Sequence, residues 1–218
     1  MNKKIAVIDY GMGNLRSVEK GLLRVGLEAR VTRSAREVAE ADAVVLPGVG
    51  AFRDCMANLD RFNLIEPVRR ALASGRPFLG ICLGLQALFT ESEEFGHCEG
   101  LGFFRGKVVR FSDDLREPDA GPDAPALKVP HMGWNQVTRK KEVAVLRGIP
   151  ADAHFYFVHS YHVVPEDPAI IATTTSYGLE FVSSVAQGNV FASQFHPEKS
   201  QRHGLALLRN FGDLIDAS

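Results

Sequence analysis

Short apolar runs alternate with amphipathic stretches along residues 4–81 of the chain. The runs are rich in β-branched side chains and predict buried strands, and the helical spacing of apolar side chains between them predicts helices. The expected helices are residues 15–25 and 64–73, and the expected strands are residues 4–8, 27–32, 43–46 and 77–81. Because strands that alternate with helices form βαβ units, we predict an α/β fold with a mostly parallel central sheet and helices on both faces.

A different rhythm begins near residue 101, where short strands follow one another with little helix between them. This spacing is typical of hairpins, so we expect an antiparallel extension of the sheet in the C-terminal half. A last helix is expected over residues 201–215, and the segment 112–125, with three prolines and five acidic residues, predicts an exposed loop. The expected strands are residues 107–111, 155–158, 169–175, 179–184 and 190–195.

Composition limits the classes of protein to which the chain can belong. Its 218 residues suffice for one sizeable core, so we expect a single domain over residues 1–218. A net charge of −1 without a basic stripe argues against a nucleic-acid partner. Three cysteines without a CxxC pair argue against a disulfide framework or a zinc site. Apolar runs are too short for a membrane span or a signal peptide, so we expect a soluble, cytoplasmic protein.

Cys82 stands between an apolar strand and an amphipathic helix in the segment RPFLGICLGLQALF. Gly80 and Gly84 flank it two residues away on each side, which is the cysteine form of a nucleophile elbow. A side chain on such a sharp turn needs a strained backbone whose neighbours lack Cβ atoms. The helix that begins at Leu83 also points its positive end at the sulfur and favours the thiolate. A buried structural cysteine is the alternative interpretation.

A base for this thiol is expected at the end of the last predicted strand, in the segment ASQFHPEKS. His196 and Glu198 are two residues apart, so they project from the same side of an extended chain, and Pro197 favours that extended geometry. Glu198 can therefore orient one imidazole nitrogen and leave the other to face the thiol. A polar turn before a helix is the alternative. Other histidines in motif-like segments have no carboxylate placed to steer them: His131, His159 and His162.

The third predicted strand ends in LPGVGAF, where Gly48 and Gly50 flank Val49. A glycine-rich turn at the carboxyl end of a parallel strand lets backbone N–H groups face a ligand. We expect an N–H of Val49 or Gly50, together with the N–H of Leu83, to hold the oxyanion formed when Cys82 attacks a carbonyl. A phosphate loop is the alternative, but it would need lysine and serine or threonine after the glycines, where alanine and phenylalanine stand.

The segments GICLGLQ, PGVG and FHPEKS together resemble the class I, or triad, glutamine amidotransferases. With DYGMGNLRSV, KVPHMGWNQV and YFVHSYH, the chain is similar over essentially its whole length to the glutaminase subunits of imidazole glycerol phosphate synthases. The resemblance implies the three-layer class I fold and no metal or organic cofactor. It also implies that Cys82 forms a γ-glutamyl thioester with glutamine, that His196 is the general acid and base, and that Glu198 orients His196.

The same resemblance assigns residues around the substrate. Gln86 lies four residues beyond Cys82 on the same helix face, and this position contacts glutamine in the family. The loop residue Gly48 and the pair Ser160 and Tyr161, in the segment YFVHSYH, match positions that line the glutamine pocket.

A partner is implied as well. In the family, ammonia passes to a separate cyclase subunit, a (β/α)8 barrel that forms a heterodimer with the glutaminase. There it helps to make imidazole glycerol phosphate and aminoimidazole carboxamide ribonucleotide in histidine biosynthesis. Trp134, the only tryptophan, resembles the position that packs on the barrel, and a core aromatic is the alternative. Asn14 and Lys199 match positions near that interface.

The resemblance further implies that the glutaminase is nearly idle until the partner binds its own substrate. We expect the peptide at Val49, between its two glycines, to be the switch, because a peptide flip there is cheap. Alternatives within the fold stay open: a glutaminase subunit for anthranilate, aminodeoxychorismate or pyridoxal phosphate synthesis, a non-catalytic domain, or a γ-glutamyl peptidase that acts alone.

Overall fold

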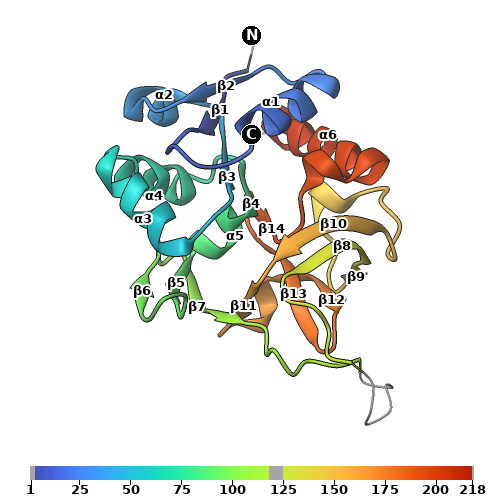
Figure 1. Cartoon of the computed structure of the whole chain (residues 1–218). Helices are drawn as coiled ribbons and strands as arrows, with labels where there is room; N and C mark the ends of the chain where they lie inside the picture. Colours follow the sequence, from blue (N-terminus) through green and yellow to red (C-terminus); the bar gives the residue numbers. More distant parts are fainter. Residues whose placement is uncertain (1–2, 118–124, 218) are drawn as a thin grey trace.

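The computed structural model describes residues 3–117 and 125–217, and in the first half its elements follow the predicted alternation of strands and helices (Figure 1). The segment expected to be an exposed loop, residues 112–125, falls only partly within this range. Residues 112–117 are exposed except for the half-buried Leu115, and residues 118–124 lie outside the described residues.

The centre of the sheet is built from parallel strands that follow the apolar runs of the sequence. Each of these strands except the edge strand β2 is buried along its whole length, as expected for strands that are covered on both faces. The predicted parallel sheet is therefore confirmed. In spatial order the strands are β2 (Ala29–Thr32), β1 (Ile5–Ile8), β3 (Ala43–Gly48), β4 (Phe78–Cys82) and β14 (Val190–Ser193).

Helices cover both faces of this sheet, so the predicted three-layer arrangement is confirmed (Figure 1). Side chains of a strand alternate between the faces. Ile5 and Val7 of β1 therefore belong to the core under α1 (Leu15–Arg24) and α6 (Gln201–Ala217). Ala6 and Ile8 belong to the opposite core. That core lies under α2 (Ala35–Glu40), α3 (Phe52–Arg61) and α4 (Ile65–Ala73).

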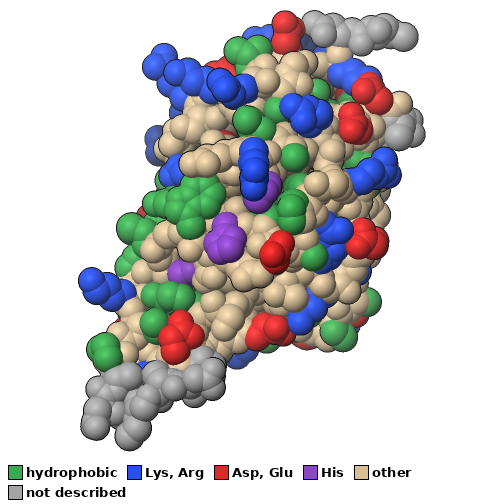
Figure 2. Space-filling model, turned by 90° about the vertical axis from the view of Figure 1, so that its right-hand side faces the viewer, with side chains coloured by type: hydrophobic (Ala, Val, Ile, Leu, Met, Phe, Trp, Pro, Cys, Tyr) green, Lys and Arg blue, Asp and Glu red, His purple; other side chains and the backbone are tan. Residues whose placement is uncertain are grey.

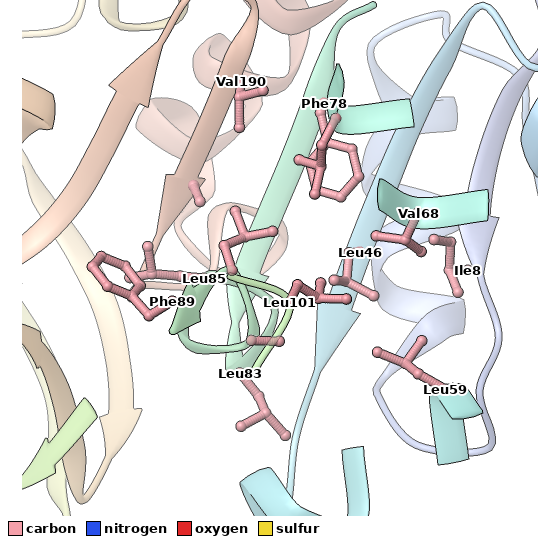
Figure 3. Packing of buried hydrophobic residues seen from close by; sticks show 14 of the residues in the cluster. Ile8, Leu46, Leu59, Val68, Phe78, Leu83, Leu85, Phe89, Leu101 and Val190 are labelled. Carbon is pink, nitrogen blue, oxygen red and sulfur yellow. The ribbon is translucent and has the colours of Figure 1, made fainter. Parts of the chain in front are cut away.

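Figure 3 shows part of this second core, in which Phe78 of β4, Val68 of α4 and Leu46 of β3 point toward the same interior. All three side chains are fully buried. Truncation of a buried phenylalanine to alanine costs about 3–5 kcal/mol of stability, so Phe78→Ala would weaken the sheet that carries Cys82.

Beyond β14 the sheet continues with mainly antiparallel strands, most of them from the C-terminal half, as predicted. A separate two-stranded antiparallel ladder lies beside it. The extension comprises β13 (Glu180–Gln187), β11 (Tyr161–Pro165), β7 (Phe104–Arg110), β5 (Phe89–Ser92) and β6 (Cys98–Glu99), with β12 (Ile171–Ser176) and β9 (Thr138–Arg139) attached at β13. The separate ladder comprises β8 (His131–Gln136) and β10 (His154–His159). The C-terminal half also contains the short 3₁₀ helices η1 (Ala144–Leu146) and η2 (Pro168–Ile170).

Several elements were not predicted. The helix α2 has only six residues, but a start signal was present, because the Ser34 hydroxyl accepts a hydrogen bond from the Glu37 N–H at 3.3 Å. The strand β8 was missed because its alternation is broken by Gly133, whose φ is 135°.

Candidate active site

The strands β3, β4 and β14 are neighbours in the sheet, and the predicted catalytic segments lie at their carboxyl ends. In the register, Gly48 pairs with Cys82, and Ser193 pairs with Ile81. The carboxyl ends of the three strands therefore meet, which is where ligands bind in open α/β sheets. This register is consistent with the prediction that the glycine loop, Cys82 and His196 lie close together at one end of the sheet.

Cys82 occupies a strained turn between β4 and the helix α5 (Leu83–Ala87). Its backbone has φ 55° and ψ −110°, a region that residues other than glycine rarely adopt. Both flanking glycines are required by close packing: a Cβ on Gly84 would overlap the Leu46 carbonyl, and one on Gly80 would lie 2.8 Å from the Ala192 Cβ. The turn thus has the features of a nucleophile elbow.

The helix after Cys82 differs from the prediction. It is a single turn of five residues and every one of them is buried, whereas an amphipathic helix was expected. The whole helix is buried because α5 packs against α3 and against the strands β3, β4 and β5. The first turn still directs its free N–H groups toward the elbow, because these groups have no partner inside a helix.

His196 follows β14 and is held by Glu198. The Nδ1 atom of His196 lies 2.8 Å from Glu198 Oε1, and both side chains are almost completely buried. His196 is extended, with φ −102° and ψ 98°, as its position before Pro197 predicts. The backbone between His196 and the Glu198 carboxylate differs from the prediction. Pro197–Lys199 form the 3₁₀ turn η3 and do not continue the extended chain.

The second ring nitrogen of His196 is available for chemistry. Nε2 is buried and has no hydrogen-bond partner among the described residues. Burial lowers the pKa of His196, but the interactions of the ring with Cys82 and with the Glu198 carboxylate outweigh burial and raise that pKa from 6.5 to about 10. At neutral pH the imidazole is therefore protonated, and it carries the proton that a leaving group would need.

Cys82 and His196 open into one cavity of about 370 Å³. The cavity brings together most of the residues that the sequence assigned to oxyanion and substrate: Val49, Gly50, Leu83, Gln86, Ser160 and Tyr161. Gly48 does not line it. This glycine lies behind the wall, where a Cβ would come within 2.5 Å of the Tyr10 hydroxyl. Its absent side chain makes room for packing, so its assignment to the substrate pocket is not supported by the lining.

Two polar residues of the site were missed in the sequence. Gln194 is completely buried, and its Nε2 donates to the Cys82 sulfur over 3.5 Å. Its Oε1 accepts from Gln86 Nε2 at 3.0 Å, and the same Gln86 nitrogen donates to the Tyr161 carbonyl at 3.1 Å. Gln194 stands two residues before His196, in the bend that follows β14, and its nearness to His196 in the sequence was the available signal.

The second missed residue is Glu94, which lines the cavity from the connection between β5 and β6. Its Oε2 accepts a hydrogen bond from the Phe52 N–H at 2.6 Å. No local pattern marks this glutamate among its acidic neighbours. Its position follows from the pairing of β5 with β7.

A larger cavity of about 540 Å³ lies at the opposite end of β1 and β2. It is lined by basic and acidic side chains, including Lys3, Arg30, Glu37 and Glu40, and contains none of the predicted site residues. Within residues 3–117 and 125–217, no group of three histidines, cysteines or acidic residues could hold a metal ion. None of the helices described is long and apolar enough to span a bilayer.

The residues expected to face a partner are exposed. Trp134 is 47% exposed on β8, so the alternative of a core aromatic is excluded. It lies opposite Tyr156 of β10 in the ladder, and Lys199 Nζ lies 5.6 Å from the centre of the Tyr156 ring. Asn14 is exposed directly before α1, a helix that packs against η3. The side of the molecule that carries β8 and α6 is turned to the viewer in Figure 2, where charges of both signs are interspersed with hydrophobic side chains.

Comparisons with known proteins identify the family of the chain. Residues 6–214 match the family described as Glutamine amidotransferase class-I. The subunit HisH of imidazole glycerol phosphate synthase from Syntrophotalea carbinolica is 56% identical over 210 residues, which cover 96% of this chain and 100% of that protein. The same subunit from Geobacter sulfurreducens is 52% identical over 211 residues, which cover 97% of this chain and 99% of that protein.

Solved structures support the fold at lower identity. A structure described as glutamine amidotransferase has a TM-score of 0.71 and 20% identity, and the match covers 97% of this chain and 98% of that one. PurLQS from Thermotoga maritima has a TM-score of 0.73 and 16% identity, with coverage of 98% and 99%. Together with the full-length identity to the two HisH subunits, these likenesses mean that the chain belongs to the class I glutamine amidotransferases and, within them, to the HisH subunits of imidazole glycerol phosphate synthase.

Proposed function

We propose that this chain hydrolyses glutamine to glutamate and ammonia with Cys82, His196 and Glu198, and passes the ammonia to a cyclase subunit in histidine biosynthesis. The observation that carries the proposal is one arrangement. A cysteine on a strained elbow and an imidazolium, whose other nitrogen is held by a buried carboxylate, open into the same cavity.

The first half-reaction releases ammonia. The Cys82 thiolate attacks the side-chain amide carbon of glutamine, and a C–S bond forms as the carbonyl oxygen becomes an oxyanion. His196 Nε2 gives its proton to the amide nitrogen, the C–N bond breaks, and ammonia leaves a γ-glutamyl thioester. The raised pKa of His196 supports this role, because the ring still holds a proton at neutral pH.

The second half-reaction restores the enzyme. Neutral His196 removes a proton from a water molecule, and the resulting hydroxide attacks the thioester carbon. The C–S bond then breaks, glutamate leaves, and the sulfur departs as a thiolate beside the protonated ring. Glu198 keeps Nδ1 protonated and the ring aligned throughout, as the third member of a triad does.

Charge and hydrogen bonding suit glutamine as the substrate. Glu94 places a carboxylate at the cavity wall, where it can pair with the α-ammonium group of the substrate. Gln86 donates both of its amide hydrogens to protein acceptors, so its oxygen is the atom that remains to accept a hydrogen bond from glutamine. Ser160 and Tyr161 complete the wall.

The oxyanion is assigned to the loop after β3 and to the start of α5. Val49 and Gly50 line the cavity with Leu83, and Gly50 has φ 94°, a conformation that glycine adopts at no steric cost. A flip of the peptide at Val49 would aim or withdraw one N–H donor, and loss of one such donor costs about 3–4 kcal/mol of transition-state stabilisation. We therefore place the partner-controlled switch here.

The partner is the cyclase subunit, which we propose to be a (β/α)8 barrel that binds as a heterodimer. Free ammonia would be lost to water, so the transfer path must be sealed by an interface. Trp134 and Met132 are exposed on the same strand at 47% and 62%, and Lys199 and Asn14 lie exposed nearby on η3 and before α1. Exposed aromatic anchors of this kind typically dominate binding energy. The ammonia then contributes to imidazole glycerol phosphate, with release of aminoimidazole carboxamide ribonucleotide.

The test is a glutaminase assay of the purified chain, alone and with the cyclase subunit of the same organism and its nucleotide ligand. We expect little turnover alone and strong stimulation by the liganded partner. Full activity of the isolated chain would contradict partner gating and favour a γ-glutamyl peptidase. No turnover under any of these conditions would contradict the glutaminase assignment.

A further inference from the structure

Two chains of hydrogen bonds meet at the backbone carbonyl of Tyr161. The first begins at Asn135 on β8, whose Nδ2 lies 3.1 Å from His131 Nε2. His131 Nδ1 lies 2.9 Å from His159 Nε2, and His159 Nδ1 lies 2.8 Å from the Tyr161 oxygen. The pairing of β8 with β10 places His131 directly opposite His159 in the ladder.

The second chain leads from the same oxygen to the nucleophile. Gln86 Nε2 donates to the Tyr161 oxygen and to Gln194 Oε1, and Gln194 Nε2 donates to the Cys82 sulfur. We call the whole series, from Asn135 through His131, His159, Tyr161 O, Gln86 and Gln194 to Cys82, the relay.

The direction of every link in the first chain is fixed. A carbonyl oxygen only accepts, so His159 Nδ1 carries the proton and donates to Tyr161. Burial lowers the pKa of His159 to about 3, so this ring is neutral and its Nε2 accepts from His131 Nδ1. Burial also lowers the pKa of His131 to about 4, so its Nε2 accepts from the Asn135 amide. The second hydrogen of that amide goes to the Ser176 carbonyl at 2.9 Å.

Such a chain leaves its members little freedom. Each N–H of these side chains points at an acceptor, and a change of rotamer in one residue would leave the next with an unsatisfied polar group. The aromatic surroundings restrict the rings further, because His131 stacks on Tyr177 with 4.1 Å between centroids and on Phe157 with 4.9 Å.

The far end of the relay lies on the strand that faces the proposed partner. Met132 and Trp134 of β8 are exposed, whereas His131 of the same strand is buried and faces the interior. Contact with the exposed face therefore acts on the strand that carries the start of the relay, and the other end touches the attacking atom.

We propose that His131, His159 and Gln194 are positioning residues, which hold Gln86 and the Cys82 sulfur for attack and couple them to the partner-facing strand β8. This inference rests on the proposed glutaminase function. The physical basis is the unbroken series of hydrogen bonds that joins the two histidines to Gln86 and to the Cys82 sulfur.

The first test compares two conservative substitutions in one aromatic cluster. His131→Phe keeps a stacked ring and removes the links to Asn135 and His159. His162→Phe is the matched control, because His162 is buried among the same rings, 4.7 Å from the Phe111 centroid, and its Nδ1 has no hydrogen-bond partner within residues 3–117 and 125–217. We expect partner-stimulated kcat to fall about tenfold in His131→Phe and to stay within about twofold in His162→Phe.

A structural role alone would predict another outcome. Equal losses of kcat in both variants, or a loss in His131→Phe that follows its fall in Tm, would overturn the proposal. In His131→Phe, kcat should fall more than the KM for glutamine rises, because Gln86 is only one of the residues assigned to bind the substrate. The affinity for the partner, measured by titration calorimetry, should stay near the wild-type value, because the variant leaves the exposed face of β8 unchanged.

The second test is a double-mutant cycle with Gln194→Met, a change that preserves volume and removes the donor to the sulfur. Residues that act as one unit are not additive. We expect the His131→Phe, Gln194→Met double variant to lose little more kcat than the worse single variant. A loss equal to the product of the two single losses would contradict one connected relay.

The wild-type chain in the same assay separates this inference from the function on which it rests. An inactive wild type with liganded partner would refute the glutaminase function itself. An active wild type, with His131→Phe indistinguishable from His162→Phe, would refute the relay and leave the function intact.

Discussion

Two buried histidines line the same cavity and behave in opposite ways. His196 and His159 are 2% and 6% exposed, and burial alone would lower the pKa of both. Glu198 and the sulfur of Cys82 reverse this effect at His196, where the pKa rises to about 10. His159 bonds to the Tyr161 carbonyl and to the neutral His131, and its pKa falls to about 3.

The comparison shows that neighbouring charge, more than burial, divides the site into two regions. In the proposed mechanism, the triad region of Cys82, His196 and Glu198 is charged and moves protons. The region of His131 and His159 is neutral and moves none, so it is suited to hold groups in place. The predictions below test whether the two regions differ in this way.

The largest effect is expected at the nucleophile. Cys82→Ala removes the atom that forms the thioester, so partner-stimulated glutaminase turnover should fall at least about 10⁴-fold. Circular dichroism and affinity for the partner should be unchanged, because the side chain is small and its elbow turn also accepts alanine at no greater strain than cysteine. Glutaminase turnover retained in Cys82→Ala would show that Cys82 is not the nucleophile.

A smaller loss is expected when the charge of the third triad member is removed. Glu198→Gln keeps the shape but no longer stabilises the imidazolium, and we expect kcat to fall about 10³-fold. Glu94→Gln is the matched control, since it makes the same change at another carboxylate next to the same cavity. It should raise the KM for glutamine about tenfold while kcat changes only a few-fold, because it weakens one charge pair with the substrate. Equal kcat losses in both variants would contradict the division of roles.

The smallest of these effects concerns the face of β8 above the neutral region. Trp134→Ala should weaken binding to the cyclase subunit about 10- to 100-fold, the range of an interface hot spot. Trp134→Phe keeps an aromatic anchor and should lose less. Isothermal titration calorimetry measures the affinity of both variants. An unchanged affinity in Trp134→Ala would show that the partner binds another face of the protein.

Much of the framework could be predicted from local sequence. Apolar runs mark the buried strands β1, β3 and β4 because strands covered on both faces leave no polar positions. The elbow at Cys82 could be predicted because two glycines at fixed spacing are a steric requirement, and in the structure the Leu46 carbonyl and the Ala192 Cβ leave no room for their Cβ atoms. The pairing of His196 with Glu198 was predicted, but the bond forms across the 3₁₀ turn η3 and not along an extended chain.

The positions of Glu94 and His131 could not be predicted, because they depend on the pairing of strands that are far apart in the sequence. Glu94 reaches the cavity through the register of β5 with β7, and His131 meets His159 through the ladder of β8 with β10. Neither register is encoded in a local period. The helix α5 was predicted to be amphipathic, but its apolar pattern reflects burial on all sides.

The most direct test of the account is the protonation of the two cavity histidines in the wild-type chain, followed by ¹⁵N NMR as the pH is raised. Since the pKa of His196 is raised, its ring should carry protons on both nitrogens at neutral pH and lose one only as the pH rises through about 10. His159 should remain neutral, with the proton on Nδ1, at every pH well above about 3. A His196 ring that is already neutral at pH 7, or a His159 ring that gains a second proton near pH 6.5, would contradict the division between a charged triad and a neutral relay.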